Sequence, residues 1–257
     1  MVLPPVLTIA AFTVREASRN RMPWLLGIVV VSSFGLSEFV GEVAIAEASE
    51  TKSALLAGFL RFFSVFLVAL FVTTSVVRDF NDKVLESILS LPFPRSVYYF
   101  GKLIGFLALA ILVALTIAAG LLLYATPFQV AIWVASLLCE LIIVSAVGLV
   151  CIFSFHHLTT AFSAVFGFYI LARMIGAIEL MVTSPLVLAG NPSQEVVNAV
   201  VSGIAFVLPD LYRFTQSRWL MYEGVAWADL VPIAGQTAVY LVLLIGVGLF
   251  DLYRKDL

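Results

Sequence analysis

The sequence predicts an all-α protein that crosses a membrane several times, and three observations lead to this prediction. Hydrophobic residues make up 62% of the 257 residues and charged residues only 12%, and the mean hydropathy of +1.11 is far above that of a soluble domain. The apolar residues gather in runs close to the length of about 20 residues that a helix needs to cross hydrocarbon. These runs do not alternate between apolar and polar positions, as the strands of a membrane barrel would.

The first element we expect is an amphipathic helix over residues 6–21 that lies along the membrane surface. Its apolar positions are interspersed with the charged side chains of Arg15, Glu16, Arg19 and Arg21. Such a helix rests its apolar face in the interface. Pro23 then marks the start of the first spanning helix, because proline is favoured in a first helical turn.

Six runs are long enough to span the membrane. They place the spanning helices at residues 24–44, 54–77, 103–124, 128–153, 159–183 and 230–252. Their orientation follows from Lys and Arg in the short loops, which favour the cytoplasmic side. With the N-terminus inside, that side receives Arg15, Arg19, Arg21, Arg78, Lys83, Arg95, Lys102, Arg254 and Lys255, and the outer side only Lys52, Arg213 and Arg218. We therefore expect both termini to be cytoplasmic.

The densest charged segment, residues 78–102, lies between the second and third runs and predicts an amphipathic helix over 79–91. Phe80, Val84, Ile88 and Leu91 recur at helical spacing, while Asp79, Asp82, Lys83, Glu86 and Ser90 face elsewhere. Pro92 and Pro94 end the helix. One face would lie on the membrane or core, which leaves the other for a partner.

This segment resembles the first cytoplasmic loop of the type 2 ABC transporter permeases. The matching positions are Arg78-Asp79, Leu85-Glu86, Leu89, Pro92, Arg95 and Gly101-Lys102, and residues 12–21 are similar to the start of these permeases. In that family the loop is the coupling helix that contacts the ATPase subunit. The resemblance implies this contact for Arg78, Asp79, Asp82, Lys83, Glu86, Ser87 and Ser90. An ordinary interfacial amphipathic helix is the alternative.

The resemblance implies an exporter subunit in the cytoplasmic membrane of a bacterium. Two ATPase subunits would carry ATP and Mg²⁺, and a second permease copy, alike or different, would complete the complex. The outer segment 185–208 contains an apolar stretch, 196–208, that is too short to cross and must re-enter the membrane or lie on it. Family members have paired re-entrant helices here, and Leu208-Pro209-Asp210-Leu211 is similar to the turn that follows them.

The sequence contains none of the common catalytic motifs, so we expect the chain not to be an enzyme by itself. Gly101-Lys102-Leu103 lacks the upstream glycine and the following Ser or Thr of a P-loop, which leaves ATP to another chain. His156-His157 is interpreted as an interfacial pair, with a metal or proton role as the minor alternative. Cys139 and Cys151 are about 18 Å apart along one helix. We predict no metal site or bound cofactor, and the net charge of -2 argues against nucleic-acid binding.

Five charged residues fall inside predicted spans or near their ends: Glu38, Arg61, Glu140, Arg173 and Glu179. A lone charge at that depth costs several kcal/mol, so partners are expected. Adjacent spans suggest pairing of Glu140 with Arg173 and of Glu38 with Arg61, whereas Glu179 has no evident partner. Such charges either line a transport pathway or lock helices together.

Two other functions stay open beside the exporter. In an ATP-independent channel or secondary transporter, the midplane charges would form the ion site. A membrane anchor would bind a partner at residues 78–102 and would transport no substrate.

Two further patterns concern helix packing. Gly101 and Gly105 form a small-x-x-x-small step that predicts close helix packing. The Phe-rich face at Phe59, Phe62, Phe63 and Phe66 predicts a lipid-facing or packing surface.

Overall fold

The computed structural model describes residues 4–43, 48–83, 94–155, 157–182, 192–214, 216, 218–221 and 226–254. All regular structure in these ranges is helical: α1 (Pro5–Arg19), α2 (Met22–Val43), α3 (Ala48–Asn81), α5 (Arg95–Leu121), α6 (Pro127–Ser154), α7 (Leu158–Val182), α8 (Pro192–Val207), α9 (Leu211–Phe214), α10 (Arg218–Met221), the 3₁₀ helix η1 (Trp227–Asp229) and α11 (Leu230–Arg254).

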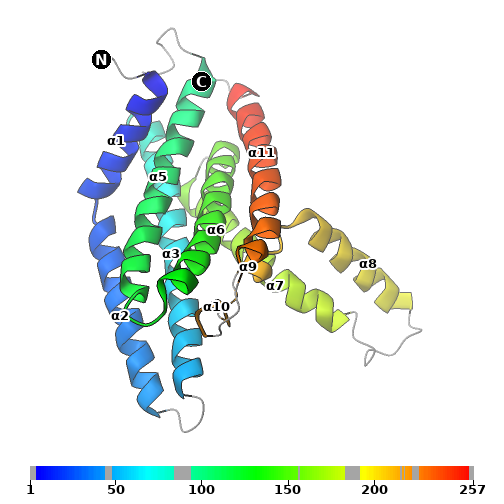
Figure 1. The fold of residues 1–257 in the computed structure, drawn as a ribbon. Helices are drawn as coiled ribbons and strands as arrows, with labels where there is room; N and C mark the ends of the chain where they lie inside the picture. The colour runs from blue at the N-terminus through cyan, green and yellow to red at the C-terminus, as the bar shows by residue number, and fades with distance from the viewer. Residues whose placement is uncertain are drawn as a thin grey trace.

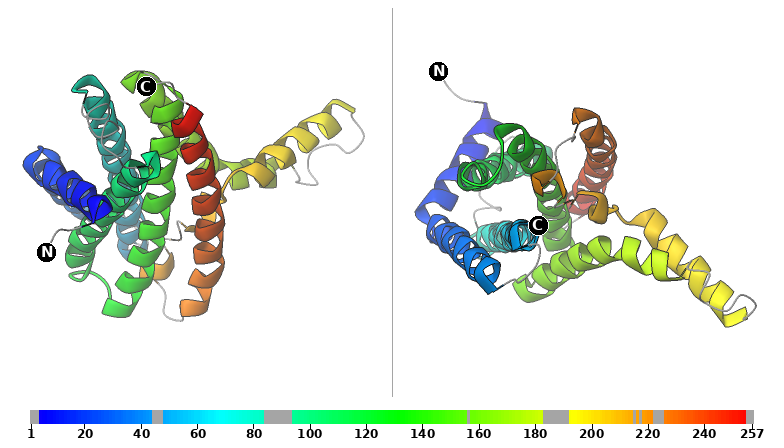
Figure 2. Two further views of the ribbon diagram at one scale, coloured as in Figure 1. Left: turned by 90° about the horizontal axis from the view of Figure 1, so that it is seen from above. Right: turned by 60° about the horizontal axis from the view of Figure 1, so that its bottom comes forward.

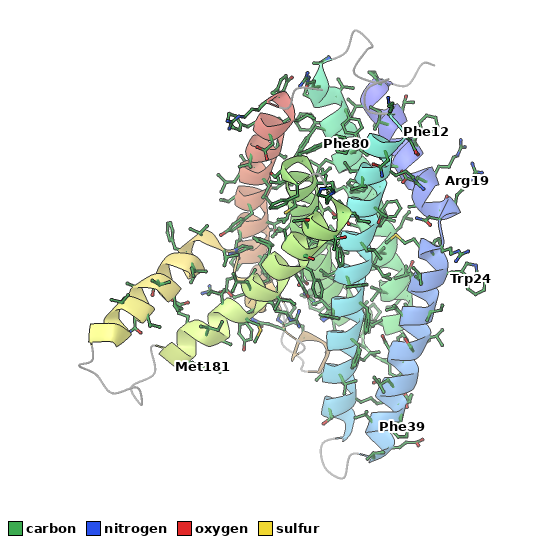
Figure 3. All side chains as sticks on the ribbon, turned by 180° about the vertical axis from the view of Figure 1, so that it is seen from behind. Phe12, Arg19, Trp24, Phe39, Phe80 and Met181 are labelled. Atoms are coloured by element: carbon green, nitrogen blue, oxygen red, sulfur yellow. The ribbon has the colours of Figure 1, made fainter. Side chains whose placement is uncertain are left out.

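Six of the described helices are long and apolar enough to cross a membrane, namely α2, α3, α5, α6, α7 and α11 with η1. The prediction of an all-α multi-pass membrane protein is confirmed at this level. Large apolar side chains cover the outer surface: Figure 3 shows Phe12, Trp24 and Phe39 along the outer side of α1 and α2, and these side chains are 65%, 79% and 65% exposed. In a membrane this surface faces lipid.

Helix α6 is the centre of the bundle and contacts α3, α5, α7 and α11 (Figures 1 and 2). It begins at Pro127, where the Gln129 side chain accepts a hydrogen bond from the Thr126 backbone N–H at 3.2 Å. Most of its side chains are apolar and buried, but Ser136, Glu140 and Ser145 are also fully buried. The central helix therefore carries polar groups that neighbouring helices must satisfy.

Helix α1 packs lengthwise against the first half of α5 (Figure 1). The close approach depends on two glycines: a Cβ added at Gly101 would lie 2.7 Å from the Ile9 Cβ, and one at Gly105 would lie 2.6 Å from the Thr13 Cβ. The predicted close packing at this small-x-x-x-small step is confirmed. Instead of lying across the ends of the spanning helices, α1 runs beside α5 and bends into α2.

The starts of α1 and α5 and the ends of α3, α6 and α11 lie at the same end of the molecule (Figure 1), which we name the network end. There Arg95 donates to the Leu252 carbonyl at 3.1 Å, and the Ser154 hydroxyl donates to Asp251 at 2.6 Å. The end of α2 and the start of α3 lie at the opposite end. The successive spanning helices α2, α3, α5 and α6 therefore alternate in direction.

Helices α7 and α8 pack on each other and project from the bundle (Figures 1 and 2). The base of α7 is fixed to α3 by rings: Phe66 meets Phe162 and Phe166 edge to face, with centroids 5.5 and 5.7 Å apart. The Phe-rich face predicted on the second span is thus a packing surface between helices. Within the predicted outer segment 185–208, the described part is the single helix α8.

Candidate functional site

A buried cluster of charges lies at the centre of the bundle. The Arg61 Nη1 donates to Glu140 Oε2 at 2.9 Å, and the two side chains are only 2% and 0% exposed. The same guanidinium donates to the Phe214 carbonyl at 2.7 Å and to the Ser136 hydroxyl at 2.9 Å. It also lies over the Trp133 ring, 4.6 Å from the centroid. Three helices, α3, α6 and α9, are thereby tied together by one arginine.

A second arginine approaches the same carboxylate from α7. The Arg173 Nη1 lies 3.8 Å from Glu140 Oε1 and donates to the Tyr169 hydroxyl at 3.0 Å. Arg173 is 30% exposed, whereas Glu140 is fully buried. Glu140 Oε1 accepts no hydrogen bond from the described residues. The cluster thus holds one carboxylate between a tight buried partner and a looser one on α7.

The expected pairing of Glu38 with Arg61 is wrong. Glu38 forms an ion pair with Lys52 and accepts a hydrogen bond from the Tyr124 hydroxyl at 2.9 Å. Helix α3 begins at Ala48, earlier than predicted, so Lys52 stands on the helix opposite Glu38. Arg61 lies nine positions further along α3, a distance of about 14 Å.

The hydrogen bond to Glu38 also affects the pKa of Tyr124, which follows the end of α5. The hydrogen bond with this carboxylate raises the pKa of Tyr124 above its ordinary value, because the protonated hydroxyl is the donor.

The predicted pairing of Glu140 with Arg173 is present, but Arg61 is the closer partner of Glu140. Glu179 lies apart from the cluster, on the wall of a cavity. It does have an interaction partner within the structure.

A second polar network joins α1, α3 and α5 at the network end. Lys102 is nearly buried and lies 2.8 Å from Asp79, which also accepts a hydrogen bond from the Tyr98 hydroxyl at 2.8 Å. Glu16 of α1 forms an ion pair with Arg78 and lies 3.7 Å from Lys102. Ser75 links both parts, donating to Glu16 at 3.0 Å and accepting from Lys102 at 3.1 Å.

This network changes the interpretation of the segment predicted to contact an ATPase. Arg78 and Asp79 belong to α3 and bind partners within the chain. Asp82 and Lys83 follow α3 and are exposed, and Lys83 has the left-handed φ of 55° that ends a helix. Glu86, Ser87 and Ser90, with the rest of the predicted helix up to 91, lie outside the described residues.

A cavity of about 740 Å³ lies between α7, α8, α9, α10 and α11, toward the side of the molecule away from the network end. Its walls include Glu179, Asp210, Arg213, Trp219 and Asp229. Arg213 Nε donates to Asp210 Oδ2 at 2.6 Å, while the buried Asp210 Oδ1 accepts no hydrogen bond from the described residues. The cavity touches the buried cluster through α9, whose Phe214 carbonyl accepts from Arg61.

Sequence reasoning missed several groups of the buried cluster. Ser136 stands one helical turn before Glu140, and Tyr169 one turn before Arg173, so helical spacing contained a signal for both. The Phe214 carbonyl had no such signal, because a backbone group on a short helix carries no pattern. No group of three or more His, Cys, Asp or Glu able to hold a metal occurs within the described ranges.

Fold and sites together define an all-α, multi-pass membrane protein with an arginine–glutamate cluster buried between its helices. No protein-family model matches the sequence. No curated protein matches it significantly either.

Proposed function

We propose that the chain is the membrane-spanning subunit of an ABC exporter of the type 2 class, located in the cytoplasmic membrane of a bacterium. It would work with two copies of a separate ATPase subunit and with a second permease copy. The network end would face the cytoplasm, and α8 would belong to the re-entrant part on the outer side. The substrate would be exported at the expense of ATP bound, with Mg²⁺, by the partner subunits.

The observation that carries the proposal is the pairing of Asp79 with Lys102 across the base of the loop. These residues flank the segment whose motif resembles a coupling helix, and their side chains lie 2.8 Å apart. Glu16 extends the same network to α1. A push on the loop would therefore move α1, α3 and α5 together, since buried ion pairs with several hydrogen bonds resist separation. Asp82, Lys83, Glu86, Ser87 and Ser90 would contact the ATPase.

Movement at the network end would then reach the centre of the bundle along α3. That helix carries Asp79 at one end and Arg61 near its middle, and Arg61 holds Glu140 on α6 and the Phe214 carbonyl. A tilt of α3 would strain these contacts, while Arg173 offers Glu140 a second partner on α7. This arrangement suits a protein whose helices rearrange between two states.

The test is purification of the tagged chain from its native membranes in a mild detergent, followed by mass spectrometry and an ATPase assay. We expect a stoichiometric ATP-binding subunit, which is lost when Asp82 and Glu86 are both reversed to Lys. Glu42→Lys, an exposed acidic position at the far end of α2, is the control and should retain it. Recovery of the chain without an ATPase would overturn the proposal.

A second candidate function is ion-gradient-driven transport, which the buried Arg61, Glu140 and Arg173 favour because intramembrane charges often form ion pathways. This function predicts transport in vesicles that follows an imposed ion gradient without ATP. The exporter predicts transport only with the ATPase subunit and ATP. A membrane anchor predicts partner binding without either activity.

A further inference from the structure

The cavity beside α7 has the size and the mixed lining of a small-molecule site. Its volume of about 740 Å³ lies within the range of roughly 300–1,000 Å³ that ligand pockets occupy. The lining mixes apolar side chains, such as Ile175, Phe206 and Ile233, with amides and carboxylates such as Gln236 and Glu179. A ligand held here would therefore have an apolar body and a polar or charged group.

The charges of the lining favour a cation. Three carboxylates, Glu179, Asp210 and Asp229, face one guanidinium, that of Arg213, so the described lining carries a formal charge of -2. Arg213 is committed to Asp210 Oδ2, and the buried Asp210 Oδ1 receives no hydrogen bond from the described residues. Glu179 and Asp229 are exposed, and a cleft lined by charges of one sign raises the local concentration of ions of the opposite sign. The net charge of the lining would repel an anion.

Aromatic rings in the lining suit an organic cation. Phe206, Tyr240 and Trp219 stand in the wall; Phe206 is 89% exposed and offers its ring to a ligand, whereas Trp219 is buried and packs into the core. The hydroxyl of Tyr240 donates to the Val207 carbonyl at 3.1 Å, which fixes its ring at the join of α8 and α11. Aromatic faces bind organic cations through their negative quadrupole, in addition to apolar contact.

A bare metal ion fits this lining poorly. The three carboxylates come from α7, from the start of α9 and from η1, and no group of three or more metal-ligating side chains is present among the described residues. Ca²⁺ and Mg²⁺ need six or more oxygens at short range, and Zn²⁺ needs three or four closely placed ligands. A larger ion with spread charge needs only one or two carboxylates and an apolar wall.

We propose that this cavity binds a monovalent organic cation with an apolar body, held by Glu179 and Asp229 and by the aromatic rings of Phe206 and Tyr240. That such cations are the exported substrate rests on the proposed exporter function. Binding itself does not, because the cavity belongs to this chain alone. Contact of α9 with Arg61 would connect occupancy of the cavity to the buried cluster.

The first test measures binding to the whole chain in lipid nanodiscs by equilibrium dialysis, with empty nanodiscs subtracted. The probe is tetraphenylphosphonium, and the matched anion of nearly equal size is tetraphenylborate. We expect saturable binding of the cation and none of the anion. Equal binding of both, binding of neither, or displacement of the cation by millimolar Ca²⁺ with saturable Ca²⁺ uptake would overturn the proposal.

A variant test assigns the binding to this cavity. The double substitution Glu179→Gln with Asp229→Asn should weaken cation binding about ten-fold or more, a loss of about 1.4 kcal/mol or more. Asn keeps an oxygen for the hydrogen bond that Asp229 accepts from the Ala226 N–H at 3.3 Å. Glu42→Gln should bind as the unchanged chain does. Unchanged affinity in the folded double variant would contradict the assignment.

A third measurement separates this inference from the proposed function. If an ATPase subunit co-purifies, tetraphenylphosphonium should stimulate its hydrolysis, and the double variant should lose that response. Cation binding without any associated ATPase would uphold the cavity and reject the exporter. An associated ATPase in a complex that binds no cation would uphold the exporter and reject the cation site in the cavity.

Discussion

At the centre of the bundle the Glu140 carboxylate faces two guanidinium groups that hold it unequally. Arg61 is buried, lies 2.9 Å away and makes further hydrogen bonds, whereas Arg173 lies 3.8 Å away and is 30% exposed. Loss of the buried partner should strand a charge, while loss of the exposed one should not.

We therefore predict that Arg61→Leu destabilises the protein by about 3–5 kcal/mol, the usual cost of breaking a buried ion pair. Arg173→Leu should cost clearly less, because Arg61 still satisfies Glu140. The double variant Arg61→Leu with Glu140→Gln should recover most of the loss, since no charge is then stranded. The measurement is the apparent melting temperature in detergent. Equal losses in the two single variants, or no recovery in the double variant, would refute this account.

The identity of these buried charges could be predicted from the sequence, but their pairing could not. A charge within an apolar run is visible in the sequence, and its need for a partner follows from desolvation. Partner choice depends on which helices touch, and α3 meets α6 although α5 lies between them in the chain. The wrong partner for Glu38 has a simpler cause. The second span was predicted to begin at residue 54, so Lys52 was placed in a loop, whereas α3 begins at Ala48 and contains it.

At the scale of elements, α1 is held by the two glycines of α5. Both helices approach so closely at Gly105 that a Cβ there would lie 2.6 Å from the Thr13 Cβ. A Cβ added at Gly167 of α7, in contrast, would meet no atom of another part of the structure within 4 Å. The spacing of the two glycines predicted a close contact for α5. It could not identify α1 as the partner helix, because the motif describes only the surface of α5.

These two glycines give a matched pair of substitutions. Replacing a helical glycine with alanine should gain about 1 kcal/mol of helix propensity, so Gly167→Ala should be neutral or stabilising. Gly105→Ala should instead push α1 away, which lowers the melting temperature. Because the loosened helix unfolds locally more often, trypsin should cleave faster at Arg15 and Arg19, whose side chains are already exposed. Limited proteolysis checks this outcome. Similar cleavage rates in both variants would show that α1 does not depend on the close approach.

At the scale of the whole molecule, the sequence predicted six spanning helices because hydrocarbon thickness fixes their length and desolvation fixes their composition. The bounds of α3 and α5 differ from the prediction at their ends, where polar network residues continue the helices beyond the apolar runs. The projecting pair of α7 and α8 was not foreseen, since its position depends on the packing of α7 against α3, α6 and α9.

The direction of the chain across the membrane is the last prediction. Described basic residues gather at the network end, with Arg78 and Lys83 at the end of α3, Arg95 and Lys102 at the start of α5, and Arg254 at the end of α11. Such an excess is retained on the cytoplasmic side. In a chain with Cys139 and Cys151 replaced by Ala, Thr51→Cys should react with a membrane-impermeant maleimide added to intact cells. Asn81→Cys should react only after permeabilisation, because both positions are exposed but lie at opposite ends of α3. The reverse pattern would place the segment 78–102 outside, where no ATPase could reach it, and would remove the exporter proposal together with the orientation.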